Sequence, residues 1–193
     1  MSDTVRELSL FLMELDALKG IQRRSYTEGA KRLENSAEHS WHLAMACWNV
    51  AEAFDLPLDH ERLLKLALVH DVGEIDAGDT SLYSASREDA HLEERAGVIR
   101  LSDHPGNAIG GLVELWDQQE YGSSPEAKLL KAMDRLLPFL LNIHSHGKTW
   151  ADLDVRKSQV ERAHAFIADD FPEIHAWMAE QIEHAAQEGW LKE

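Results

Sequence analysis

The sequence is poor in cysteine, in basic residues and in long apolar runs. Its 193 residues include a single cysteine, Cys47, so an intramolecular disulfide and a cysteine-based zinc site are both excluded. No apolar run approaches the roughly 20 residues that a membrane-spanning helix needs. The residues after Met1 lack the basic start and apolar middle of a signal peptide. We therefore expect a cytoplasmic protein that does not engage a membrane.

Basic residues are outnumbered, because 19 lysines and arginines face 35 aspartates and glutamates, for a formal charge of -16. A surface of this sign repels nucleic acid, which is not an expected partner. It also repels a phosphate substrate unless a bound cation reverses the sign locally. The 11 histidines make a metal site worth seeking. Hydrophobic residues, 44% of the total, suffice for a buried core, and the length fits a single domain over residues 1–193.

Helix signals recur along the whole chain, whereas strand signals hardly appear. Thr4 and Glu7 form a predicted capping box before an apolar stripe. Ser124 can cap a helix that has Pro125 at its first position. These patterns predict an all-α fold. The expected helices cover residues 4–15, 36–54, 60–70, 87–101, 125–141, 152–170 and 172–187. The stretches 20–35 and 72–85 are long segments without a clear helix signal.

Asp134 interrupts the apolar stripe of the fifth expected helix. At 3.6 residues per turn, Leu130, Leu137 and Leu141 all lie within about 60° of it on the helix surface. Burial of a carboxylate without a partner costs several kcal/mol, so a positive group should face Asp134. Arg135 is expected to point away from this face. The partner is then either a basic residue of another helix or a metal ion.

Two histidines and another aspartate occupy similar positions. His70 lies at the end of the apolar face of its helix and is followed directly by Asp71. His39 lies near the start of an earlier helix, on its apolar side. Two imidazoles and two carboxylates form a mixed nitrogen and oxygen set that suits a divalent metal ion. A simpler alternative stays open, in which each histidine caps a helix or fills the core and each aspartate pairs with an arginine or lysine.

The order His39, then His70-Asp71, then Asp134 resembles the pattern of the HD-domain metal-dependent phosphohydrolases. Residues 70–79 resemble the second motif of the 5′-deoxynucleotidase-like subgroup of that family. The resemblance runs from about residue 8 to residue 144. Its other matching segments are residues 36–40, 115–121, 126–128 and 134–136.

This resemblance implies a helical HD-type domain, forming a homodimer, that removes phosphate from deoxynucleoside 5′-monophosphates. It implies one bound divalent ion, such as manganese, cobalt, magnesium or zinc, and a small nucleotide as the substrate. The implied metal ligands are His39, His70, Asp71 and Asp134.

Further site residues follow from the same resemblance. Glu74 would orient or deprotonate the attacking water, and Asp79 would contact the sugar or assist in that step. The family also uses an arginine shortly before the first motif, followed by a tryptophan, to hold the phosphate and sense the sugar. Arg23 and Arg24 are the candidates for this arginine, but Ser25-Tyr26 follows them instead of tryptophan. This departure leaves open whether the protein prefers deoxyribose to ribose.

Two other functions compete with a deoxynucleotidase. The same metal core could cleave another phosphoester or phosphoanhydride, such as a nucleoside triphosphate, a cyclic nucleotide or an alarmone. Larger substrates usually need more lysines and arginines than the motifs of this chain carry, which favours a monophosphate. A non-catalytic helical module with a structural metal is the remaining alternative. Glu74 and Asp79 argue against it, because a structural site does not need them.

Overall fold

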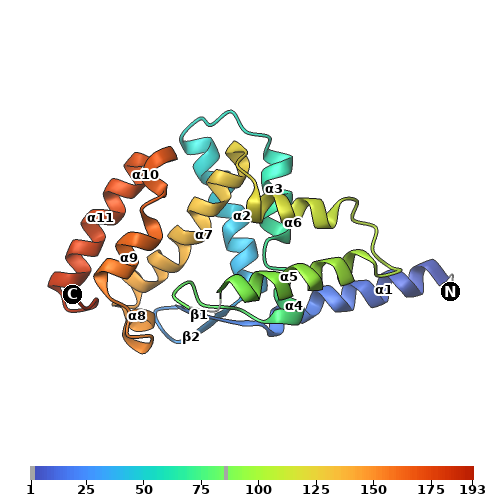
Figure 1. Cartoon of the computed structure of the whole chain (residues 1–193), viewed down its shortest axis with the longest axis horizontal. Coiled ribbons are helices and arrows are strands. Elements are labelled where there is room, and N and C mark those ends of the chain that lie inside the picture. Colours follow the sequence, from blue (N-terminus) through green and yellow to red (C-terminus); the bar gives the residue numbers. More distant parts are fainter. Residues whose placement is uncertain (1–2, 85–86) are drawn as a thin grey trace. The chain divides into compact units, whose positions relative to one another are not determined.

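The computed structural model describes residues 3–84 and 87–193 of the chain (Figure 1). Helices dominate these residues, which confirms the all-α prediction, and one short two-stranded hairpin accompanies them. In chain order the elements are α1 (Asp3–Asp16), the 3₁₀ helix η1 (Ala17–Gly20), β1 (Gln22–Thr27), β2 (Arg32–Asn35), α2 (Ser36–Ala53), α3 (His60–Val69), α4 (Glu74–Ala77), α5 (Arg87–Ser102), α6 (Leu112–Tyr121), α7 (Pro125–His144), α8 (Lys148–Asp152), α9 (Lys157–His164), α10 (Ile167–Asp170) and α11 (Pro172–Gln187).

The chain falls into two compact units. The first consists of Met1–Arg23 and Asn35–Leu130, and the second of Arg24–Glu34 and Lys131–Glu193. Both α7 and the hairpin contribute residues to each unit. The single domain over residues 1–193 that the sequence suggests stays a prediction.

The first unit is built around an apolar cluster. Its buried members are Phe11, Val69, Val72, Val98, Leu101, Leu112 and Trp116. Burial of one large apolar side chain stabilises a fold by roughly 1.5–3 kcal/mol. The indole of Trp116 is fully buried and donates a hydrogen bond to the backbone carbonyl of His70 at 3.0 Å. The core therefore fixes the end of α3, where the predicted ligands His70 and Asp71 lie.

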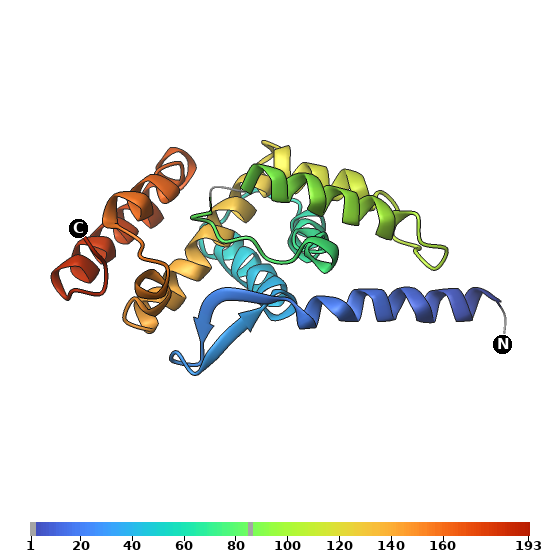
Figure 2. The same cartoon turned by 60° about the horizontal axis from the view of Figure 1, so that its bottom comes forward.

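Much of α1 lies at the edge of the first unit. Figure 2 shows its N-terminal turns extending beyond the neighbouring helices. Phe11 of this helix is buried, whereas Leu8, Leu12 and Met13 are 43%, 55% and 65% exposed. The apolar stripe that predicts this helix thus turns only partly toward the core.

Local hydrogen bonds fix the start of α2. The Asn35 side chain accepts the backbone N–H of Glu38 at 3.0 Å, and the Glu38 carboxylate accepts the Asn35 N–H at 2.7 Å. This capping box begins the helix at Ser36 and places His39 in its first turn. His39 therefore enters the site from a helix whose start is set by neighbours in sequence.

The stretch 20–35, where no helix is expected, contains the β-hairpin. The residues between its strands include Glu28, Gly29 and Ala30, which take left-handed backbone conformations with φ of 54°, 65° and 69°. The strands are short and mostly polar, so they lack the alternation of apolar and polar residues that predicts a strand.

The stretch 72–85 begins with the short helix α4. A Cβ atom on Gly73, just before this helix, would lie 2.5 Å from the carbonyl oxygen of Glu94. A glycine at this position lets α5 pass close to the chain that follows Asp71. Glu74 is the first residue of α4 and is buried, so a short turn over residues 70–73 separates the end of α3 from this predicted site residue.

The second unit packs aromatic rings against α7. The ring centroid of Phe139 lies 5.7 Å from that of Trp150 and 5.5 Å from that of His164. The expectation of one helix over residues 152–170 is wrong, because that stretch holds the two helices α9 and α10. The start at Asp152 is also wrong, because Asp154 has a positive φ of 54° and a left-handed residue cannot continue a helix, so α9 begins only after it.

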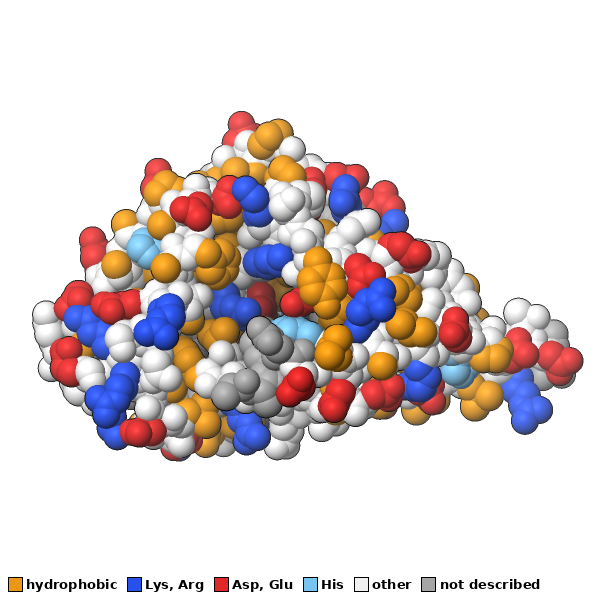
Figure 3. All heavy atoms as spheres, viewed as in Figure 1, with side chains coloured by type: hydrophobic (Ala, Val, Ile, Leu, Met, Phe, Trp, Pro, Cys, Tyr) orange, Lys and Arg blue, Asp and Glu red, His pale blue; other side chains and the backbone are white. Residues whose placement is uncertain are grey.

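Acidic side chains are spread over the face of the molecule that Figure 3 shows, in keeping with the formal charge of -16. Within the described ranges, every helix is too short or too polar to span a bilayer.

Candidate active site

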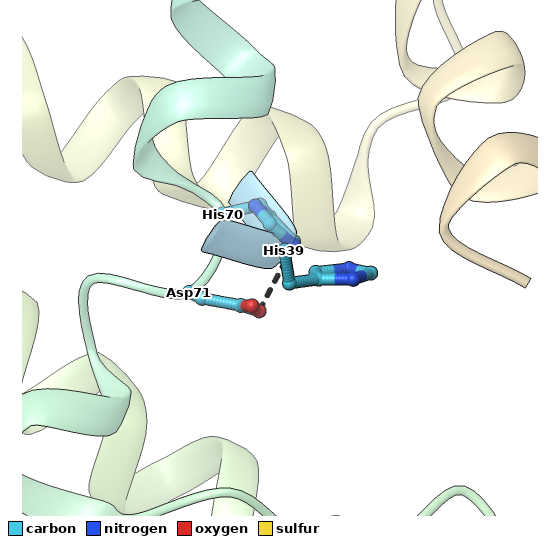
Figure 4. Close-up of side chains that lie close together, drawn as sticks. All are labelled: His39, His70 and Asp71. Atoms are coloured by element: carbon cyan, nitrogen blue, oxygen red, sulfur yellow. Dashed lines mark ion pairs between the residues drawn. The ribbon is translucent and has the colours of Figure 1, made fainter. Parts of the chain in front are cut away.

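Three predicted ligands come together in the first unit. His39 of α2 and the His70-Asp71 pair after α3 are all buried, and one donor atom of each lies within 4.8 Å of the others. Figure 4 shows the Asp71 carboxylate turned toward the His70 ring. Two imidazole nitrogens and a carboxylate oxygen at such distances suit a divalent metal ion. The donor set therefore fits the metal that the sequence predicts.

The ring of His70 is oriented by the backbone. Its Nδ1 donates to the carbonyl oxygen of Ala67 at 2.8 Å, which directs Nε2 to the other side, 3.0 Å from Oδ1 of Asp71. A histidine that binds a metal typically donates its second ring nitrogen to a carbonyl in this way. The ring of His39 lies nearby, with its centroid 5.4 Å from that of His70.

Arg23 lies among three carboxylates of the same unit. Its Nη1 donates to Oδ2 of Asp71 at 2.6 Å. The same nitrogen lies 3.7 Å from Oε1 of Glu74 and 3.8 Å from Oδ1 of Asp79. The structure thus brings Arg23, Glu74 and Asp79 together with Asp71, as the sequence predicts for one site.

Burial and neighbouring charges shift the pKa values of Asp71 and Glu74 in opposite directions. Burial opposes ionisation of Asp71, but its interactions with the neighbouring His70 and Arg23 hold its pKa at about 2. Burial, reinforced by the charge of Asp71, raises the pKa of Glu74 to about 9, against the opposing effects of Arg23 and a hydrogen bond from Ser36. One carboxylate is thus kept ionised while its neighbour favours a proton.

The raised pKa of Glu74 predicts how stability depends on pH. The pKa is about 9 in the folded chain against an ordinary value of 4.5, so folding favours the neutral acid. Its contribution is complete below pH 4.5 and is lost as the pH rises toward 9. After metal is chelated, the free energy of unfolding in urea should fall with pH more steeply than in Glu74→Gln, by up to about 1.4 kcal/mol per pH unit. Equal pH slopes for the two proteins would contradict this prediction.

Asp134 and Arg24 belong to the second unit. Asp134 is on α7 with its side chain 17% exposed, and it accepts a hydrogen bond from Nη1 of Arg135 at 2.7 Å. The expectation that Arg135 points away from Asp134 is therefore wrong. The proposed role of Asp134 as the fourth metal ligand stays a prediction.

Arg23 and Arg24 are successive residues of β1, so their side chains point to opposite faces of the strand. The side chain of Arg23 is 12% exposed, whereas Arg24 is exposed. Among the described residues of the first unit, the contacts above favour Arg23 as the arginine that serves the site.

Three further residues of the site had no role assigned from the sequence. Trp116 and Gln119 of α6 both approach the His70 carbonyl, at 3.0 and 3.5 Å. Ser36 donates its hydroxyl hydrogen to Oε2 of Glu74 at 2.5 Å. Trp116 lies in a segment that resembles the family, which is a usable signal, but nothing in the sequence connects Ser36 with Glu74.

The chain is similar to several known proteins. A model of the HD domain matches residues 15–175. The chain is 29% identical to the 5′-deoxynucleotidase HDDC2 of Danio rerio over 129 residues, which is 65% of this chain and 63% of that protein, less than two thirds of its length. It is 27% identical to the 5′-deoxynucleotidase HDDC2 of Homo sapiens over 174 residues, which is 88% of this chain and 81% of that protein.

A solved structure resembles almost the whole chain. It is the crystal structure of a predicted metal-dependent phosphohydrolase from Magnetospirillum magnetotacticum MS-1, which is 30% identical in sequence. The two structures superpose with a TM-score of 0.86 over 98% of each chain.

Proposed function

We propose that this chain, which belongs to the HD domain family, is a metal-dependent phosphohydrolase that removes phosphate from deoxynucleoside 5′-monophosphates. The observation that carries this proposal is the buried cluster of His39, His70 and Asp71 beside Arg23 and Glu74. The similarity of the chain to proteins named 5′-deoxynucleotidase supports the choice of substrate.

The metal is proposed to be one divalent ion, with manganese, cobalt, magnesium and zinc as candidates. His39, His70 and Asp71 would hold it, and we propose Asp134 as the fourth ligand. Such an ion, when bound, supplies a Lewis acid that polarises a phosphoryl oxygen and lowers the pKa of a nearby water and nearby acids.

The remaining residues act on the substrate and on the attacking water. A bound cation would lower the raised pKa of Glu74 and favour its ionised form. Glu74 is then proposed to orient the water and take its proton as the water oxygen forms a bond to phosphorus. The guanidinium of Arg23 can grip two phosphate oxygens and offset the charge that develops on them. Asp79 lies within 3.8 Å of Arg23. It is proposed to contact the sugar or to assist in activating the attacking water. The ester oxygen then leaves with the nucleoside.

A homodimer in the cytoplasm completes the proposal. The exposed leucines and methionine along α1 support self-association, because apolar residues gathered on a surface often mark an interface.

A panel of nucleotides tests the activity. The protein is stripped of metal, supplied with each candidate ion in turn, and assayed for phosphate release from ribo- and deoxynucleoside 5′-monophosphates. We expect release that requires metal and favours the deoxy forms, with 3′-monophosphates of the same nucleosides as the matched control. Release without a sugar preference would support a nucleoside monophosphate phosphatase but contradict the proposed preference for deoxyribose. No release with any ion would contradict the proposal, and triphosphates in the same panel would then test a larger substrate.

A further inference from the structure

Ser36 is a fully buried serine at the start of α2. Its hydroxyl donates to Oε2 of Glu74 at 2.5 Å, although the two residues are 38 positions apart. Both residues belong to the first unit. A buried hydroxyl bonded to a buried carboxyl oxygen fixes that oxygen, because breaking the bond would leave two buried polar groups unsatisfied.

The backbone of Ser36 is held without help from its hydroxyl. Its N–H donates to the carbonyl oxygen of Ile21 at 3.0 Å, and its own carbonyl oxygen accepts the hydroxyl of Ser40 at 2.8 Å. Asn35 caps the helix at the same place. The backbone position of Ser36 is therefore fixed by contacts that do not involve its hydroxyl, and the hydroxyl can be removed while they remain.

The two oxygens of Glu74 face different groups. Oε2 accepts the Ser36 hydroxyl, whereas Oε1 lies on the side of Arg23, 3.7 Å from its Nη1. Arg23 also contacts Asp71, one of the three clustered ligands. A glutamate side chain has three torsions, and the last is broad, so an anchor on one oxygen decides where the other points.

We propose that Ser36 is a positioning residue, whose hydroxyl anchors Oε2 of Glu74 so that Oε1 faces the site where water is activated. This inference rests on the proposed function, since it gives Glu74 the role of base. The hydroxyl of Ser36 bonds Oε2 of Glu74. It acts through Glu74, so its loss should slow the chemical step and leave substrate and metal binding in place.

The test compares three variants with the wild type in the phosphate-release assay. Ser36→Ala removes the hydroxyl and should lower kcat about 10- to 100-fold, with KM changed less than about threefold. Ser36→Thr retains a hydroxyl and should recover kcat to within about threefold of the wild type. Ser40→Ala is the matched control, because it removes a buried hydroxyl one turn along the same helix that bonds the Ser36 carbonyl and not Glu74. The hydrogen bond from the Ser36 N–H to Ile21 and the Asn35 cap still hold the Ser36 backbone in this variant. Ser40→Ala should leave kcat within about twofold of the wild type.

Two further readouts separate positioning from support of the fold. Metal affinity by calorimetry and unfolding in urea should be similar in Ser36→Ala and Ser40→Ala. An unchanged kcat in Ser36→Ala, beside an active wild type, overturns the role of Ser36 and leaves the phosphohydrolase intact. Parallel loss of metal affinity or of folding in Ser36→Ala also overturns it, in favour of a structural role. A wild type that releases no phosphate with any ion overturns the proposed function itself.

Discussion

Asp71→Asn is expected to abolish metal binding and to lower kcat/KM for a nucleoside monophosphate by about 10³-fold or more. Asp71 is 8% exposed, with a pKa of about 2, and its Oδ1 lies 3.0 Å from Nε2 of His70. Asparagine retains the shape of the side chain but removes the charge that it offers a cation. Metal content after dialysis, measured by mass spectrometry, and steady-state kinetics check this result.

Asp117→Asn is the matched control. Asp117 is also an aspartate of the first unit paired with an arginine, since Arg95 donates to its two oxygens at 2.8 and 2.9 Å. It is a third exposed and takes no part in the cluster of ligands. Metal content and kcat/KM should stay within about twofold of the wild type, because a surface ion pair contributes about 1 kcal/mol or less. Full metal occupancy in Asp71→Asn would refute Asp71 as a ligand.

The same measurements decide the role of Asp134. Asp134→Ala should lose metal and activity together if this carboxylate is the fourth ligand. Its hydrogen bond with Arg135 offers a competing explanation for its place on an apolar stripe. Metal retained at full occupancy in Asp134→Ala would contradict Asp134 as a ligand and would leave its pairing with Arg135 as its only role.

The sequence predicts the parts of the site whose signals are local or ordered along the chain. The capping box joins Asn35 and Glu38, which are three positions apart, so the start of α2 can be predicted without knowledge of the fold. His39 and His70-Asp71 are found because their order resembles a family. In the structure one donor atom of each lies within 4.8 Å of the others, and their role as metal ligands stays a prediction.

Features that depend on the reach of single side chains could not be predicted. Adjacent residues point about 100° apart around a helix, yet the long side chain of Arg135 bends back to Asp134. Ser36 finds Glu74 across 38 positions, a pairing that follows from the tertiary fold and not from spacing. The hairpin was missed because its strands carry polar residues such as Arg23, whose partners are the acids of the site and not an apolar core.

Arg23→Gln is expected to lower kcat/KM about 100- to 1,000-fold while metal stays bound. The guanidinium lies within 4 Å of carboxylate oxygens of Asp71, Glu74 and Asp79 and is 12% exposed, so glutamine removes the positive charge that faces the phosphate site. Metal affinity should be retained, because Arg23 is a cation beside Asp71 and its removal adds no competing charge. Steady-state kinetics and calorimetry with the metal alone separate these two effects.

Arg24→Gln is the matched control for this substitution. It removes the same charge one residue along β1, from a side chain that is exposed on the opposite face of the strand. Its kcat/KM should stay within about twofold of the wild type. The kcat/KM of Arg23→Lys should lie between those of the wild type and Arg23→Gln, since an ammonium keeps the charge but cannot hold two phosphate oxygens as a planar guanidinium does. A large loss in Arg24→Gln with a small one in Arg23→Gln would transfer the phosphate contact to Arg24, and would mean that the contacts of Arg23 with the three acids serve only to balance their charge.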